Sequence, residues 1–167
     1  MKTLILSILF LPLFSFSCLA QGFSDLDKSP IDIAYFPYNF SHDRKEGKKA
    51  LIRVIYSRPA RKERAIFGNL VPYGQVWRTG ANEATEIKFY QDLEMGGKKV
   101  KAGTYSLFTI PKEKEWTIIL NAALDYWGAY SYKAEQDIAR VTARVSTLPD
   151  RVENFTIQFE GNGEKKA

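Results

Sequence analysis

Cysteine and histidine are almost absent from this chain of 167 residues, which contains one of each, Cys18 and His42. Because Cys18 lies in a leader-like stretch, the rest of the chain excludes disulfides and thiol nucleophiles. His42 lies in the polar segment "SHDRKEGKK", which predicts a surface loop, and a Ser-His-Asp triad would need this one histidine. Zinc needs several His or Cys ligands, and no glycine-rich phosphate loop precedes a helix. The sequence predicts no metal or other cofactor, although carboxylates alone leave calcium open.

A large excess of one charge sign is also lacking. Lys and Arg number 24 against 19 Asp and Glu, which gives a formal net charge of +5. The lysine pairs at 48–49, 98–99 and 165–166 fall in predicted turns or in the tail, where solvated charge is the ordinary explanation. A nucleic-acid partner would need a concentrated basic face in a recognised module. We therefore predict no binding to nucleic acid.

The first 20 residues have the pattern of a secretory signal peptide. Lys2 provides a positive start, residues 4–16 form an apolar run, and Cys18-Leu19-Ala20 gives a small-x-small cleavage pattern. We expect cleavage after Ala20 and export to the periplasm or cell surface, with no membrane span in the mature protein. A retained membrane anchor is the alternative, but the run is short for a spanning helix. Lipid attachment at Cys18 is a further alternative, which ranks behind cleavage after Ala20 because Phe16 is bulky for a lipoprotein signal.

Apolar residues alternate with a period of two along most of the remaining chain, which predicts β-strands. We therefore predict a single domain over residues 21–167, an all-β antiparallel β-sandwich of the jelly-roll type. Two long loops, at 57–75 and 121–137, interrupt the pattern, and we expect them to be functional and to meet at one end or edge. The predicted strands are 31–33, 50–57, 85–90, 98–101, 104–111, 115–120, 138–145 and 152–160.

The first loop leads directly into "VWRTGANEAT" (76–85), which concentrates polar side chains in a short turn. Arg78 or Arg58 could hold an anionic or carbonyl oxygen through its planar guanidinium. Asn82 and Glu83 could bind hydroxyls, and Trp77 could offer a flat apolar face to a sugar ring. The alternative is structural: an Arg–Glu pair would hold the loop to its sheet, Asn82 would occupy a turn, and Trp77 would belong to the core.

The second loop contains "LDYWGAYSY", in which Trp127 and Tyr130 flank Gly128 in an aromatic cluster. One interpretation is a surface on which a sugar or peptide stacks, and the other is a cap over an open end of the core. Glycosidase chemistry would need two carboxylates about 5 to 10 Å apart. Glu83 and Asp125, one from each loop, are the candidate pair.

Four motifs resemble a family of exported bacterial proteins, common in the Bacteroidetes group and known only as a domain of unknown function. They are "YSRP" (56–59), "IFGNLVPYGQVWRTGANEAT" (66–85), "AGTYSLFTIP" (102–111) and "WGAY" (127–130). The resemblance implies a signal-bearing all-β protein and carries no established activity. Because the motifs concentrate in the two loops, it favours a site there over a structural cap.

We therefore predict a non-catalytic module that binds a small polar or anionic ligand, with carbohydrate as the first candidate. A hydrolase acting on glycans, with Glu83 as acid or base, is the second hypothesis. A structural protein of the cell envelope is the third. The predicted binding residues are Arg58, Trp77, Arg78, Thr79, Asn82, Glu83, Thr85, Trp127 and Tyr130.

Overall fold

The structure is a computed structural model that describes residues 22–38, 40, 47 and 49–160. The predicted signal peptide and His42 lie outside the described residues. The predicted all-β fold is confirmed, because the described chain contains eight strands and no α-helix beside one short 3₁₀ turn, η1 (Ala134–Gln136). The strands are β1 (Ile31–Phe36), β2 (Ile52–Ser57), β3 (Thr85–Phe89), β4 (Leu93–Met95), β5 (Lys98–Val100), β6 (Gly103–Pro111), β7 (Glu115–Asn121) and β8 (Asp137–Arg144).

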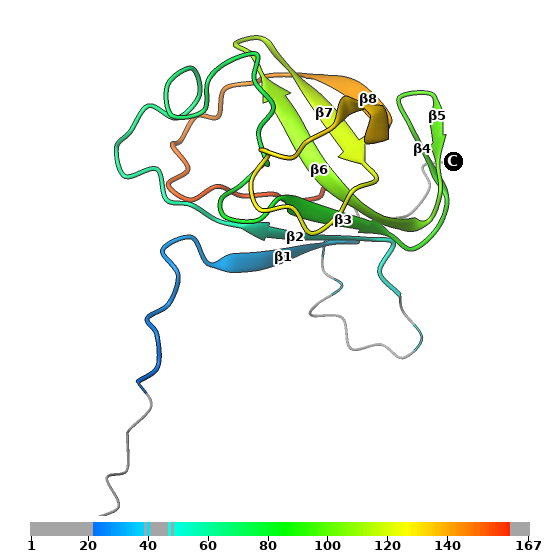
Figure 1. The fold of residues 1–167 in the computed structure, drawn as a ribbon, viewed down its shortest axis with the longest axis horizontal. Helices are drawn as coiled ribbons and strands as arrows, with labels where there is room; N and C mark the ends of the chain where they lie inside the picture. The colour runs from blue at the N-terminus through cyan, green and yellow to red at the C-terminus, as the bar shows by residue number, and fades with distance from the viewer. Residues whose placement is uncertain (1–21, 39, 41–46, 48, 161–167) are drawn as a thin grey trace, which may run out of the picture.

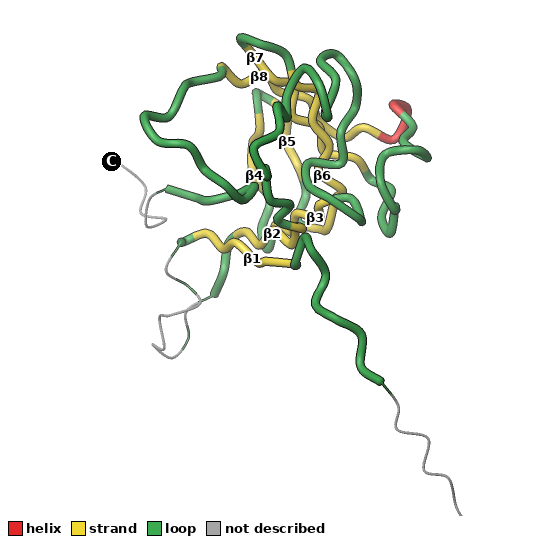
Figure 2. Tube along the Cα trace, turned by 90° about the vertical axis from the view of Figure 1, so that its left-hand side faces the viewer, coloured by secondary structure: helices red, strands yellow, loops and turns green. Residues whose placement is uncertain are grey.

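Six strands form one antiparallel sheet in the order β1-β2-β3-β6-β7-β8. The sheet curls, so that β7 and β8 lie across from β1 and β2, but it does not close into a barrel (Figure 1). Figure 2 shows the same curl from the side, with the segment after β8 crossing back towards β2. The separate hairpin β4–β5 and this C-terminal segment cover the concave side of the sheet, where a sandwich would place its second sheet.

Strand β6 lies at the centre of the sheet and is buried on both faces. Ser106, Leu107, Phe108 and Thr109 are all buried, although successive side chains of a strand point to opposite faces. Leu107 belongs to the larger core cluster inside the curl, and Phe108 belongs to a second cluster on the opposite face. The long loop between β7 and β8 covers this second cluster, since Tyr126 and Tyr132 pack against it. Each face of the sheet therefore packs against a segment outside the sheet, the C-terminal segment inside the curl and the β7–β8 loop on the opposite face.

The glycine pair that predicted a tight hairpin turn joins β4 to β5. Gly96 and Gly97 both have positive φ, 57° and 78°, as a two-residue type I′ turn requires. A Cβ atom at Gly96 would lie 2.1 Å from Val141 Cγ1 of β8, so this turn packs directly against the sheet. The turn prediction is confirmed, whereas the three-residue strand β4 was not predicted.

The segment "VENFTIQFE" (152–160) is not a strand of the sheet, so that prediction was wrong. It runs extended and makes one isolated bridge, between Asn154 and Ala60. Its period-two pattern reflects the burial of alternate side chains, because Phe155, Ile157 and Phe159 pack against the larger core cluster. The neighbouring strand β2 already pairs with β1 on one edge and β3 on the other, so β2 has no free edge with which the segment could pair.

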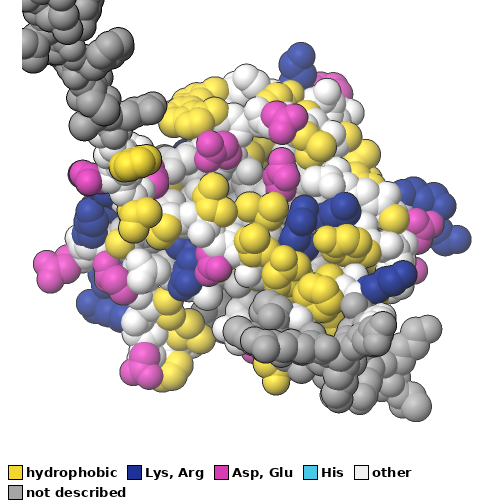
Figure 3. Space-filling view, turned by 90° about the horizontal axis from the view of Figure 1, so that it is seen from below, with side chains coloured by type: hydrophobic (Ala, Val, Ile, Leu, Met, Phe, Trp, Pro, Cys, Tyr) yellow, Lys and Arg dark blue, Asp and Glu magenta, His cyan; other side chains and the backbone are white. Residues whose placement is uncertain are grey.

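Two surface findings bear on partners. Figure 3 shows one face on which hydrophobic, basic and acidic side chains are interspersed, a mixture typical of a solvated surface. Within the described ranges, the chain forms no helix with the length and apolar character needed to span a bilayer.

Candidate functional site

A cleft of about 1400 Å³ opens between the long β2–β3 loop and the C-terminal segment. We call it the arginine cleft, because Arg61, Arg64 and Arg78 line it. The loop contributes one wall, from Pro59 to Arg78, and residues 148–158 contribute the other. The remaining lining is mostly apolar and includes Phe67, Leu70, Trp77, Trp116, Leu148, Val152 and Phe155.

Trp77 is fixed in the floor of the cleft by its backbone and its ring. Its amide donates to the carbonyl of Thr109 at 2.7 Å, and the reciprocal bond measures 2.9 Å, which joins this part of the loop to β6. The indole is 8 % exposed and packs edge-on against Phe67, Trp116 and Phe155. Trp77 therefore presents an edge within an aromatic cluster, and its flat face is not open to a sugar ring.

Arg78, the next residue, lines the cleft and carries the least satisfied polar group there. Its Nε atom is buried and has no hydrogen-bond partner among the described residues. Buried polar atoms nearly always have such a partner, and an unsatisfied donor costs about 1 to 3 kcal/mol. The position of Arg78 thus supports a group from outside the chain as its acceptor.

Thr79 and Thr85, which the sequence predicted as binding residues, hold the shape of the turn. Both are buried, and Thr85 Oγ1 donates to the carbonyl of Thr79 at 2.8 Å. Thr79 has φ of 59°, and its hydroxyl lies 3.1 Å from that of Thr109 on β6. Gly80 approaches β2 so closely that a Cβ atom would lie 3.1 Å from the Ser57 carbonyl. These residues position Arg78, and neither Thr79 nor Thr85 lines the cleft.

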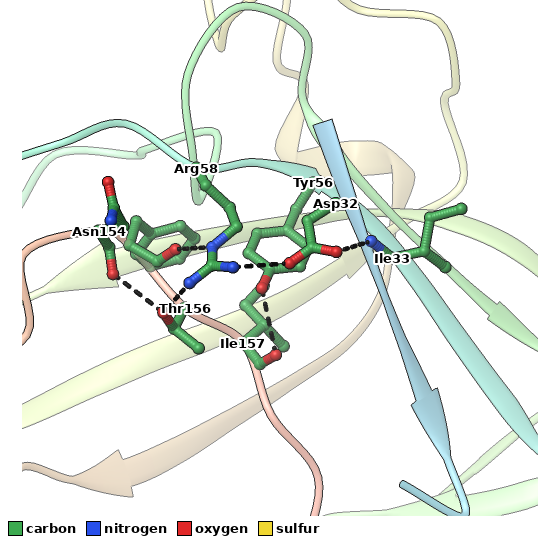
Figure 4. A network of polar contacts seen from close by, with 8 residues as sticks. Asp32, Ile33, Tyr56, Arg58, Asn154, Thr156 and Ile157 are labelled. Carbon is green, nitrogen blue, oxygen red and sulfur yellow. Dashed lines mark hydrogen bonds and ion pairs between the residues drawn. The ribbon is translucent and has the colours of Figure 1, made fainter. Parts of the chain in front are cut away.

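Arg58, also predicted to bind ligand, holds the C-terminal segment against the sheet (Figure 4). Its Nε donates to the carbonyl of Phe155 at 3.0 Å, and its Nη2 donates to Thr156 Oγ1 at 2.8 Å. Its Nη1 pairs with Asp32 of β1 at 2.9 Å. The three contacts engage the whole guanidinium, and Arg58 is outside the cleft lining. It acts on the cleft by positioning one wall.

The other four predicted residues lie where the two long loops meet, as the sequence predicted. Gly128 donates its amide to the carbonyl of Asn82 at 3.0 Å, and Glu83 forms an antiparallel bridge with Trp127. The rings of Trp127 and Tyr130 are 62 % and 82 % exposed, and they stack with centroids 5.9 Å apart at an angle of 11°. We call this exposed pair the ring stack.

Glycine is required beneath the ring stack. Gly128 has φ of 75°, and a Cβ atom there would lie 2.8 Å from the Tyr130 ring. Asn82 has φ of 58° and donates through Nδ2 to Asp27 at 3.1 Å. Glu83, its neighbour, is exposed and shares a bridge with Trp127, so their side chains project from the same face.

Each alternative hypothesis requires a specific arrangement of Glu83. The structural hypothesis expects a tight Arg78–Glu83 pair, and no such ion pair occurs among the described residues, whose pairs involve Arg58, Lys101, Lys112 and Arg140. The hydrolase hypothesis places Glu83 in a cleft, but Glu83 is outside the lining of the arginine cleft. Within the described residues, His, Cys, Asp and Glu also form no group of three or more that could hold a metal ion.

A buried polar network anchors the loop that carries the ring stack. The Asp137 carboxylate accepts from Asn121 Nδ2 at 2.8 Å, from the Tyr132 hydroxyl at 2.7 Å and from Arg140 Nε at 2.6 Å. Asn121 also donates to the carbonyl of Lys133 at 2.9 Å. Burial, helped by the hydrogen bond to Asp137, raises the pKa of Tyr132 from 10.0 to about 12.

This pKa shift predicts a loss of stability in strong base. The neutral phenol is favoured in the folded state, so the network contributes fully below pH 10.0 and its contribution is lost as the pH rises to about 12. We expect the free energy of unfolding to fall over this range more steeply in the parent protein than in Tyr132→Phe. Denaturant titrations at a series of pH values would measure the difference. Parallel profiles for the two proteins would contradict the prediction.

Fold and site together define an all-β protein in which the β2–β3 loop and a C-terminal segment build an apolar cleft lined with arginines. The chain belongs to the family described as "Protein of unknown function (DUF2911)", which it matches over residues 40–167. This match confirms the resemblance drawn from the loop motifs and covers all the predicted site residues. No curated protein and no solved structure matches the chain.

Proposed function

We propose that this protein is a non-catalytic module that binds a small anionic ligand in the arginine cleft, with Arg78 as the residue that contacts the anion. The supporting observation is the buried Arg78 Nε without a hydrogen-bond partner in the described chain. A carboxylate bound there would supply the missing acceptor. The planar guanidinium suits such a ligand, because it can form two parallel hydrogen bonds to one carboxylate.

The charges around the cleft support the same proposal. Arg61 and Arg64 use their Nε atoms on each other's carbonyls, at 3.1 Å and 2.9 Å, which holds the loop in a tight turn. Neither residue takes part in an ion pair within the described chain. Glu153 is the one acidic residue in the lining, against three arginines. This excess of positive charge would attract an anion into the cleft.

The proposed place of binding is the periplasm or the cell surface. Its support is the leader-like sequence that ends at Ala20, with cleavage there and lipid attachment at Cys18 as the two alternatives for maturation. Both would put the cleft outside the cytoplasm, where uronic acids, sialic acids and muropeptides are candidate anions.

Replacing Arg78 with leucine should weaken binding of such an anion by about 10- to 100-fold, the effect of losing a hydrogen bond to a charged group. The free variant should be at least as stable as the parent, because leucine removes the unsatisfied donor. Titration calorimetry and thermal unfolding with uronates, sialate, muropeptides and simple carboxylates would measure both effects. Arg144→Leu is the matched control, since Arg144 is an exposed arginine outside the cleft. Equal binding by parent and Arg78→Leu would overturn the proposal.

Neutral carbohydrate is a second candidate ligand, at the ring stack instead of the cleft. Flat aromatic faces beside short polar groups suit sugar rings, and Trp127 and Tyr130 are exposed with Glu83 beside them. If sugars bind there, Trp127→Ala should abolish their binding and leave binding to the cleft unchanged. Glycan arrays probed with both proteins would test this. Tyr73→Ala, which removes an exposed ring elsewhere, is the control.

A further inference from the structure

The arginine cleft gathers exposed apolar side chains on its two facing walls. Phe67 and Leu70, on the loop wall, are 38 % and 55 % exposed. Leu148 and Val152, on the C-terminal wall, are 63 % and 51 % exposed. Single exposed apolar residues are ordinary on protein surfaces, but an exposed group that lines one cleft marks a site for an apolar partner.

The floor between these walls is apolar as well. Phe67 and Trp116 pack edge-on with ring centroids 4.6 Å apart, and Trp77 and Phe155 extend the cluster at 5.2 Å. The cleft volume of about 1400 Å³ exceeds the roughly 300 to 1000 Å³ of ordinary small-molecule pockets. A short polar anion would contact Arg78 and leave most of this apolar surface in water.

We propose that the anion in the cleft is the head group of a free, single-chain carboxylic acid whose alkyl chain lies between the two apolar walls. This inference rests on the proposed function and specifies its ligand class. The carboxylate would accept from Arg78, with Arg61 and Arg64 adding positive charge, while Leu70, Leu148 and Val152 cover the chain. Burial of the chain would remove both apolar walls from water.

The position of Arg78 selects a free acid over the surface of a bilayer. Because Arg78 belongs to the lining of the cleft, a head group can reach its guanidinium only by entering the cleft. A lipid that stays in a membrane keeps its head group at the interface and its chain in the bilayer. A monomeric acid can place both its carboxylate and its chain within the cleft.

The test is titration calorimetry of the protein with butanoate, hexanoate, octanoate and decanoate, each below its micelle concentration. We expect the Kd to fall by about three- to fourfold for each added methylene, as for a chain that leaves water completely. Leu148→Asn and Val152→Asn should weaken decanoate binding by about tenfold or more and should weaken butanoate binding much less, because the shorter chain buries less apolar surface. Val145→Asn is the matched control, because Val145 is 45 % exposed and lies outside the cleft lining.

Other results separate this inference from the proposed function. Equal Kd values for butanoate and decanoate, both weakened in Arg78→Leu, would overturn the alkyl-chain inference and support the anion site. Equal binding of decanoate and its methyl ester would overturn both, because the carboxylate would then contribute nothing. Binding to anionic lipid vesicles without binding to monomeric decanoate would overturn the inference in favour of a membrane surface. Failure of every acid to bind would overturn it too, and the uronate and sialate titrations would then decide the proposed function alone.

Discussion

Replacing Asp137 with alanine should lower the free energy of unfolding by about 2 to 4 kcal/mol. The Asp137 side chain is 9 % exposed and accepts hydrogen bonds from Asn121, Tyr132 and Arg140. Alanine would remove one of the two acceptors of the fully buried Asn121 amide, together with the acceptor of the Tyr132 hydroxyl and of Arg140 Nε, and an unsatisfied buried N–H is costly. Chemical denaturation would measure the loss. Hydrogen exchange should show faster opening at residues 122–136, the loop that carries the ring stack.

Two further variants identify the cause of this loss. Asp137→Asn keeps the shape and one accepting oxygen but removes the charge, so it should lose less stability than Asp137→Ala. Asp92→Ala breaks a pair with Lys101 in which both side chains are mostly exposed, 58 % and 82 %, and should change stability little. A loss no larger in Asp137→Ala than in Asp92→Ala would show that the network around Asp137 contributes nothing to stability.

The strands could be predicted because each leaves a local mark on the sequence. Ile87 and Phe89 alternate with Glu86 and Lys88, and in the structure the first two are buried while the others are partly exposed. Gly96-Gly97 predicted its turn because few other residues adopt positive φ at both positions. The C-terminal segment could not be predicted correctly, since alternation reports a buried face and carries no information on the strand that would pair with it.

The structure separates residues that the sequence had grouped into one site. Both loops do meet at Glu83 and Trp127, but Arg78 lines a cleft from which those two residues are absent. Neighbours in sequence separate in this way because the turn changes direction at Thr79 and Asn82, both with positive φ. Asparagine is common at positive φ, and the structural alternative predicted a turn at Asn82, but threonine adopts this conformation too seldom for the sequence to reveal it at Thr79.

The cleft residues that could not be predicted from the sequence line the cleft because of tertiary contacts. Arg61 and Arg64 stand beside the predicted Arg58, but their chain positions do not show which of the three arginines faces the cleft. Leu148 and Val152 become lining residues only because the C-terminal segment crosses the opening of the curled sheet. That crossing is a tertiary contact, held in part by the amide of Arg61 on the carbonyl of Glu153 at 2.8 Å.

Arg58→Ala should lower the free energy of unfolding by about 2 to 3 kcal/mol and release the C-terminal segment. Arg58 donates to the Phe155 carbonyl and the Thr156 hydroxyl, and it pairs with Asp32. Its side chain is 33 % exposed, so water would replace these contacts only in part. Because the segment forms one wall of the cleft, the variant should also bind any ligand of the cleft more weakly. Denaturant titration, hydrogen exchange at residues 153–160 and calorimetry would measure these effects.

Variants at Asp32 and Arg58 separate the ion pair from the contacts to the segment. Asp32→Asn breaks the ion pair and keeps both bonds to Phe155 and Thr156, so it should cost less than about 1 kcal/mol, as for other pairs near the surface. Arg58→Lys keeps the charge but has one nitrogen, which cannot reach Asp32, Phe155 and Thr156 in three directions at once. It should therefore resemble Arg58→Ala in the exchange of residues 153–160. If Asp32→Asn released the segment as fully as Arg58→Ala, the ion pair and not the fork of Arg58 would hold this wall of the cleft.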